Sequence, residues 1–157
     1  MQDLQDPVLP VRAHACAQLR KLVRAKAPEV TRNITFIMGL FSAQLTDPDS
    51  YLYLAAIEGF VALGSAFPNE TIPVVAREFG ETQRATELRL KTGEALMKIA
   101  RDCGQMLPKY VPLFLPTLFQ TTKDPDPTMR ASALSNLATT CELLRFAVSL
   151  FVQELLK

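Results

Sequence analysis

An Asp-Pro dipeptide recurs along this chain at similar intervals, and each copy opens the same pattern of side chains. Asp6, Asp47 and Asp124 begin the three clear copies, and Gln83 begins a weaker one. Each clear copy has a large apolar residue five positions after the aspartate, an alanine nine after it and another large apolar residue thirteen after it. These residues are Val11, Ala15 and Leu19, then Leu52, Ala56 and Phe60, then Met129, Ala133 and Leu137. The two apolar positions lie on one face of a helix.

Between these copies the apolar residues recur at intervals of three and four, which predicts amphipathic helices. Leu96, Ile99, Ala100 and Cys103 form one such stripe, and the alternation typical of strands is missing over any useful length. We expect helices over residues 9–26, 29–46, 50–66, 69–80, 85–104, 108–122, 127–143 and 145–156. Because the connections are short, consecutive helices are expected to pack as antiparallel neighbours.

The repeat length narrows the fold class. The units start near residues 6, 47, 83 and 124, so the steps between them are similar in length. A period of roughly 40 residues with two helices per unit is typical of armadillo and HEAT repeats. The sequence therefore predicts an all-α, right-handed superhelix of antiparallel helix pairs, an α-solenoid of the HEAT/armadillo type. The competing arrangement is a closed helical bundle, which would bring the first and last helices together.

We expect residues 1–157 to form a single module that is a fragment of a longer solenoid. The chain opens with a helix of the second type at 9–26 and closes with one of the first type at 145–156, so each terminal helix lacks a partner. Solenoids need polar caps at both ends. The apolar residues of the last helix should therefore be exposed, or covered by another copy through homo-association. They are Phe146, Leu150, Phe151 and Leu155.

Turn chemistry accounts for the Asp-Pro pairs. Pro125 should stop the preceding helix, because the residue before a proline is biased away from the helical conformation. Asp126 is placed to cap the next helix, with Pro127 at its first position. Asp49 holds the equivalent place in the second copy, so both aspartates are predicted N-caps.

The charge balance restricts the partners. The chain has 17 basic and 16 acidic residues and a net charge of +1, whereas nucleic-acid-binding domains carry a strong basic excess. No apolar run is long enough to span a membrane, and the first residues lack the regions of a signal peptide. We therefore expect no nucleic-acid partner, no membrane span and an intracellular, cytoplasmic location. The basic residues of the first helix are interpreted as a solvated face, with binding to an acidic partner as the alternative: Arg12, Arg20, Lys21, Arg24 and Lys26.

Catalytic and metal-binding chemistry finds little support. His14 is the only histidine, so histidine and cysteine cannot form a metal cluster. Cys16, Cys103 and Cys141 are far apart on apolar helical stripes, which predicts buried free thiols in a reducing compartment. The glycines form no phosphate-binding loop, and no spacing pairs a nucleophile with a base. The chain is therefore expected to be no enzyme and to bind no cofactor and no metal.

The segment 113–119, followed by Asp124-Pro125-Asp126-Pro127 and Met129-Arg130, resembles HEAT repeats. The resemblance implies that Pro116 bends a continuous first helix. It also implies a ladder between repeats, built from the aspartate after each first helix and the arginine early in each second helix. The ladder residues here would be Asp6, Arg12, Asp47, Arg89, Asp124 and Arg130. Tyr53 replaces one arginine and Gln83 one aspartate, so we expect the ladder to be interrupted in the middle.

Three longer strings narrow the resemblance. The segments 4–14, 49–57 and 134–146 are similar to the C-terminal region of the transport and Golgi organization protein 6 homolog family, which is similar to the fungal factor required for nuclear transport of RNA polymerase II. This resemblance implies a role in RNA polymerase II assembly or nuclear import, or in secretory-pathway organisation. The partners would be RNA polymerase II subunits or transport factors.

The repeat and the resemblance together predict a non-catalytic scaffold for protein–protein interactions. Two alternatives remain open. One is a generic HEAT/armadillo-like transport adaptor or regulatory subunit, and the other is a ligand-binding helical bundle accessory to an enzyme.

The helix over 50–66 is the candidate partner-binding element. Glu58 is its only charged residue, and a helix that is apolar all round is normally buried all round. Neighbouring helices should cover the core stripe, which leaves Tyr51, Tyr53 and Ala55 for a groove on the concave side. The small residues that would leave room for an incoming chain are Ala55, Gly59 and Ala62. Alternatively, the tyrosines simply pack on neighbouring repeats.

Overall fold

The computed structural model describes the backbone of residues 2–155, and within that range the regular structure is entirely helical. Described side chains are those of residues 3–4 and 6–153. The elements in chain order are η1 Gln2–Gln5, α1 Leu9–Arg24, α2 Pro28–Arg32, α3 Ile34–Leu45, α4 Ser50–Ala66, α5 Pro68–Gly80, α6 Thr86–Cys103, η2 Gly104–Met106, α7 Leu107–Tyr110, η3 Val111–Leu113, α8 Leu115–Thr121, α9 Pro127–Leu144, η4 Arg145–Phe151 and α10 Val152–Leu155.

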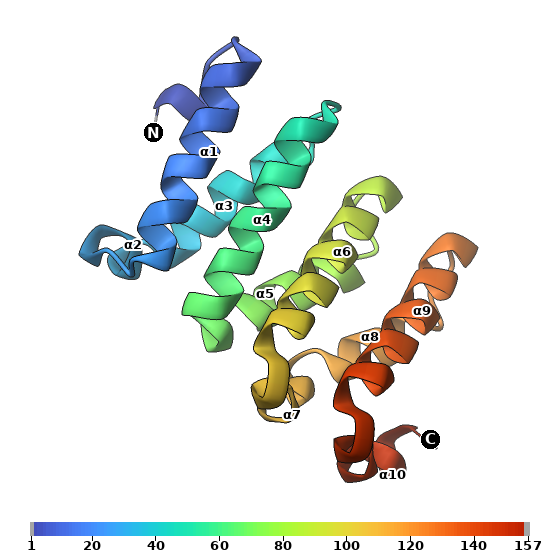
Figure 1. The fold of residues 1–157 in the computed structure, drawn as a ribbon. Helices are drawn as coiled ribbons and strands as arrows, with labels where there is room; N and C mark the ends of the chain where they lie inside the picture. Colours follow the sequence, from blue (N-terminus) through green and yellow to red (C-terminus); the bar gives the residue numbers. More distant parts are fainter. Residues whose placement is uncertain (1, 156–157) are drawn as a thin grey trace.

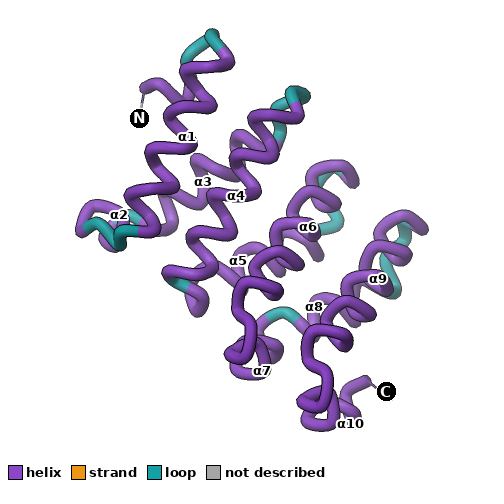
Figure 2. The backbone as a smooth tube through the Cα atoms, viewed as in Figure 1, coloured by secondary structure: helices purple, strands orange, loops and turns teal. Residues whose placement is uncertain are grey.

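The helices form two layers. In the first layer α1, α4, α6 and α9 lie side by side, and each contacts the next (Figure 1). In the second layer α3, α5 and α8 lie behind them, and each packs against its following helix, α4, α6 and α9 respectively. Short loops join the layers at the ends of the helices (Figure 2). As a result α1 and α9 stand at opposite ends of the first layer, with α4 and α6 between them.

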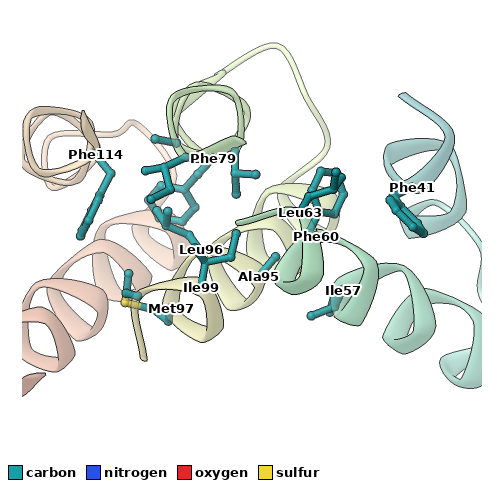
Figure 3. Packing of buried hydrophobic residues seen from close by; sticks show 14 of the residues in the cluster. Phe41, Ile57, Phe60, Leu63, Phe79, Ala95, Leu96, Met97, Ile99 and Phe114 are labelled. Carbon is teal, nitrogen blue, oxygen red and sulfur yellow. The ribbon is translucent and has the colours of Figure 1, made fainter. Parts of the chain in front are cut away.

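The core lies between the two layers. Phe41 from α3, Phe79 from α5 and Phe114 at the start of α8 point toward the first layer (Figure 3), and all three are buried. Gly59 of α4 lies against the Phe41 ring and Gly93 of α6 against the Phe79 ring, closer than a side-chain carbon would allow. Glycine inside a helix lowers the stability of that helix. At these two positions the cost is accepted because the missing side chain lets the two layers pack closely.

The predicted helix caps are confirmed. Asp49 accepts a hydrogen bond from the Tyr51 backbone N–H at 2.8 Å, and Asp126 accepts one from the Thr128 backbone N–H at 2.8 Å. Each aspartate thereby satisfies one of the unpaired N–H groups at the start of its helix. Pro127 follows Asp126 in the first turn of α9, where its missing N–H costs no hydrogen bond.

The single helix expected over 29–46 is wrong, because the structure divides it at Asn33 into α2 and α3. The Asn33 backbone has φ −129° and ψ 28°, outside the helical region. Its side-chain amide donates to the Glu29 carbonyl oxygen at 2.8 Å. Asparagine side chains compete in this way with helical backbone groups for hydrogen-bond partners. The spacing of apolar residues, on which the prediction rested, carries no information about this competition.

The continuous bent helix expected over 108–122 is also wrong. The chain forms the short helix α7, one 3-10 turn η3, and then α8, with Phe114 at φ −133° between the last two. Pro112 lies in η3, and Pro116 lies in the first turn of α8. A proline is accepted there because the N–H it lacks would be unpaired anyway. Pro116 therefore starts a helix and does not bend one.

The last segment departs from the α-helix predicted over 145–156. Arg145 has φ 50° and ψ −118°, and the chain continues as a 3-10 segment to Phe151 before the short α10. The expected exposure is confirmed for Phe146, which is 95% exposed, and for Leu150, which is 72% exposed. It is wrong for Phe151, which is buried. The burial of Leu155 lies outside the described side chains.

Candidate functional site

The turns between the layers are built around the aspartates of the repeat. One carboxylate oxygen of Asp47 accepts from the Asp49 backbone N–H at 2.9 Å, and Asp124 accepts from the Asp126 backbone N–H at 2.9 Å. These side chains mimic a backbone turn. The second oxygen of each carboxylate remains available for another element.

That second oxygen pairs with an arginine of the preceding helix in the first layer. Arg12 of α1 lies 2.9 Å from Asp47, and Arg89 of α6 lies 2.5 Å from Asp124. The Arg12–Asp47 pair is about one-fifth exposed, whereas both side chains of the Arg89–Asp124 pair are buried. Arg89 also donates to the Phe79 carbonyl oxygen at 2.9 Å. Each pair joins the arginine of one unit to the aspartate of the next unit.

Two arginines also close the turns of their own units. Arg12 donates to the Asp6 carbonyl oxygen at 2.8 Å, and Arg130 donates to the Asp124 carbonyl oxygen at 2.9 Å. The Asp6 carboxylate accepts from the Val8 backbone N–H at 2.8 Å. Within one unit, therefore, each arginine meets its aspartate through a backbone oxygen and not through the carboxylate.

The middle step between α4 and α6 has a different contact. Tyr53 stands where the arginine would be, and the Lys91 ammonium lies 4.2 Å from the centre of its ring. Lys91 also donates to the Leu45 carbonyl oxygen at 3.0 Å. Gln83, which stands where the aspartate would be, is exposed. A cation over an aromatic face is an attractive contact, and it joins the two units that the sequence leaves without an arginine–aspartate pair.

Burial and pairing shift the acidity of two groups near these junctions. The hydrogen bond from Arg89 lowers the pKa of Asp124 below its ordinary value, although burial of the carboxylate opposes the shift. Burial of the Cys16 thiol raises its pKa to about 11, against the opposing charge of Arg12. Cys16 is therefore an unreactive, protonated thiol at neutral pH.

The prediction that all three cysteines are buried is wrong for two of them. Cys16 is buried, but Cys103 and Cys141 are partly exposed. The stripe predicted around Cys141 does not lie wholly in the core either, because Leu134 is 59% exposed. For Cys141 and Leu134 the reason is that α9 stands at the end of its layer, where α6 flanks it on one side only.

The candidate partner-binding residues of α4 separate into two groups. Tyr51 is 69% exposed and Leu54 is 40% exposed. Tyr53 and Ala55 are half-buried, Tyr53 under Lys91. Two small residues offered as room for an incoming chain do not serve that purpose, because they face the core. They are Gly59 and Ala62.

Further along α4, charged side chains join it to α6. Lys98 of α6 lies 3.3 Å from Glu58 of α4 and 3.4 Å from Glu94 of its own helix. Ser65 of α4 donates to Asp102 of α6. Helix α4 therefore carries the exposed patch, Tyr51 and Leu54, in its N-terminal half, and its following turns contact charged residues of α6.

Two kinds of feature are missing from the described part of the chain. Within residues 2–155, no group of three or more histidine, cysteine, aspartate or glutamate residues is placed to hold a metal ion. The helices in that same stretch are too short or too polar to cross a bilayer.

A cavity of about 590 Å³ opens between the C-terminal ends of α6 and α9. Arg101, Glu142, Arg145 and Phe146 are among the residues that line it. The sequence pattern did not indicate this site, because it predicted a regular α-helix over 145–156 and not the 3-10 segment that places residues 145–147 on the cavity wall. The one sequence feature that pointed to this region was the expected exposure of the apolar residue Phe146.

Comparison with known proteins places the chain in a family. The family model described as "Required for nuclear transport of RNA pol II C-terminus 1" matches residues 1–106, more than half of the chain. The chain belongs to this family. The resemblance inferred from the sequence strings is thereby confirmed. The match includes the Arg12–Asp47 junction and the exposed Tyr51 patch, and it ends before α8 and α9 begin.

Two relatives align with most of this chain at modest identity. Transport and Golgi organization protein 6 of Drosophila melanogaster is 29% identical over 136 residues, which is 87% of this chain and 15% of that protein. RNA polymerase II assembly factor RTP1 of Saccharomyces cerevisiae (strain ATCC 204508 / S288c) is 25% identical over 96 residues, 60% of this chain and 10% of that protein. The chain therefore spans only a small part of the length of these relatives.

Proposed function

We propose that this chain is a non-catalytic scaffold that holds a protein partner, built as a right-handed superhelix of HEAT/armadillo type. The layered arrangement supports this, since within the first layer α1 packs against α4, α4 against α6 and α6 against α9. A ligand-binding closed bundle would bring α1 and α9 together, whereas α4 and α6 lie between them. The units starting near 6, 47, 83 and 124 would then form part of a longer, intracellular solenoid.

The observation that carries the proposal is the exposed patch on α4. Tyr51 and Leu54 are the large apolar side chains of α4 that are exposed, by 69% and 40%. Tyrosine combines a large apolar area with a polar tip and is enriched in protein interfaces. The neighbouring charges of Glu58, Glu94 and Lys98 form a polar rim of the kind that surrounds an interface centre.

In this scaffold the ladder residues have a structural role. The pairs Arg12–Asp47 and Arg89–Asp124 join consecutive units, and the contact of Lys91 with Tyr53 joins the middle two. These contacts set the position of each helix in the first layer relative to the next. They would thereby shape the open face that receives the partner.

The names of the relatives suggest the class of partner. We propose that the open face binds a subunit of RNA polymerase II or a factor that transports it. A generic transport adaptor of the same fold, with an unrelated protein partner, is the alternative within this class.

The proposal is tested by measuring the binding of purified RNA polymerase II subunits to the purified chain with biolayer interferometry. Tyr51→Ser is expected to weaken binding at least tenfold and to leave the melting temperature within a degree or so, because the side chain is exposed. Phe36→Ser is the matched control, since Phe36 is an aromatic residue, 53% exposed, on α3 in the other layer. The proposal is contradicted if Tyr51→Ser binds the subunits as well as Phe36→Ser does, or if the unmodified chain does not bind them.

A further inference from the structure

The cavity at the C-terminal ends of α6 and α9 is a second candidate site, separate from the Tyr51 patch. Its volume of about 590 Å³ is enough for several side chains of a ligand. The apolar part of its wall is formed by Ala100, Pro108, Leu143, Leu144 and Ala147. Neither the sequence pattern nor the proposed scaffold role assigns a task to this cavity.

The charged groups at the cavity are exposed and carry one more positive than negative charge, which suits an anionic ligand group. Arg101 and Arg145 line it, together with the acidic residue Glu142. Among the described residues, none of these three side chains forms an ion pair or a side-chain hydrogen bond. Arg101 lies in the last turn of α6, where a cation is favoured by the helix dipole. Arg145 lies just beyond α9.

Arg145 has a backbone conformation that favours glycine. Its φ of 50° and ψ of −118° nearly repeat those of Gly104, which follows α6 with φ 52° and ψ −127°. The two residues hold equivalent places, each directly after a first-layer helix in successive units. An arginine held in such a conformation stores backbone strain, and residues of this kind cluster at ligand clamps. At this position the preceding unit has Gly104, whereas the last unit has Arg145, whose guanidinium side chain lines the cavity.

An exposed aromatic residue adjoins this arginine. Phe146 lines the cavity and is 95% exposed, the highest value among the large apolar side chains described. Contact with a large apolar group would remove much of this surface from water. The ligand that fits both features carries a carboxylate for the arginines and a large apolar side chain for Phe146 and the cavity wall.

We propose that this cavity binds a short peptide segment of a protein partner, in which an acidic residue lies next to a large apolar residue. The site goes beyond the proposed scaffold function, because it names a second surface with its own ligand chemistry. A failure at this site leaves the test of the Tyr51 patch unaffected.

The ligand chemistry is tested by selecting a displayed library of random peptides against the full 157-residue chain. Arg145→Gly is used for counter-selection, since glycine suits the backbone at that position and the fold is retained. The expected result is a consensus with aspartate or glutamate within two positions of phenylalanine, leucine or tyrosine. Absence of enrichment, or a consensus without an acidic residue, overturns the proposal.

One selected peptide, labelled with fluorescein, then serves as the probe for fluorescence anisotropy. Arg145→Gly and Phe146→Ser are each expected to weaken its binding at least tenfold. Arg77→Gln, a change at an exposed arginine of α5, is the matched control and is expected to bind as the unmodified chain does. Tyr51→Ser is also expected to bind the peptide normally, which separates this site from the proposed partner face.

Two further outcomes would overturn the proposal. A peptide in which glutamine replaces the acidic residue could bind equally well, which would remove the role of the guanidinium groups. Sedimentation could instead show a self-associated chain that Phe146→Ser converts to a monomer. In that case a second copy, and not a peptide of a partner, would occupy the cavity.

Discussion

Asp124 shows how much of this fold depends on one carboxylate. One of its oxygens closes the turn before α9 by accepting from the Asp126 backbone N–H, and the other pairs with Arg89. Its backbone oxygen accepts from Arg130. Because the Arg89–Asp124 pair is buried, loss of either partner leaves a charge without solvent or counter-ion.

The two arginine–aspartate junctions should therefore differ in strength. We expect Arg89→Ala to lower the free energy of unfolding by about 3 kcal/mol, because it leaves the buried Asp124 carboxylate unpaired. Arg12→Ala should cost about 1 kcal/mol, because water reaches the Asp47 carboxylate. Urea unfolding followed by circular dichroism measures both, and equal losses would show that burial does not distinguish the pairs.

The acid stability of the chain should depend on the same carboxylate. The pKa of Asp124 is lower in the folded chain than its ordinary value, chiefly through the hydrogen bond from Arg89. Its contribution to stability is therefore present above the ordinary aspartate pKa and is lost as the pH falls through the lowered value. Asp124→Asn should reduce the slope of unfolding free energy against pH in that acidic range. Asp3→Asn, at an exposed aspartate, is the control that should retain the slope.

Arg145 and Gly104 form a matched pair for measuring backbone strain. Arg145→Gly should raise the free energy of unfolding by about 1 kcal/mol, because glycine adopts this conformation without a steric cost. Gly104→Ala should lower it by a similar amount, about 1 kcal/mol, for the converse reason. Steric clashes do not contribute to the effect of Gly104→Ala, since nothing lies within 4 Å of a side-chain carbon at Gly104. Thermal unfolding of both variants tests the opposite signs.

Along α4, two neighbouring tyrosines have different surroundings. Tyr53→Ser should lower the free energy of unfolding by about 1 kcal/mol, because it removes the ring under Lys91 and its half-buried area. Tyr51→Ser should change it by no more than about 0.5 kcal/mol, since surface substitutions have small effects. Chemical denaturation of the two variants in parallel tests this, and a larger loss for Tyr51 would place that side chain in the fold and not at an interface.

Helix boundaries were predictable where a side chain caps the helix. Asp49 and Asp126 lie directly before α4 and α9, and both helices begin as the sequence predicts. Apolar periodicity carries no such signal at Asn33 or Phe114, where one backbone residue leaves the helical region while the apolar pattern continues. For that reason the α2–α3 and α7–α8 segments were each predicted as one helix.

The candidate site was predictable in part for a related reason. Tyr51 stands out in sequence because its helix carries a single charge, and the structure places it at the surface. The separation of Tyr53 from Tyr51 needs Lys91, which lies in another helix. The cavity needs the ends of α6 and α9 side by side and the turn at Arg145. Sequence patterns within one helix therefore do not predict the contacts between units on which these features of the site depend.

Across the whole molecule, the neighbour-only packing of α1, α4, α6 and α9 has a mechanical consequence. A tension applied at the two ends passes along the junctions of this layer in turn, so these junctions are loaded in series. The force at which the chain yields is then set by its least stable junction and does not increase when further units are added. Extension under a steady pull would proceed in steps, one helix of the layer at a time.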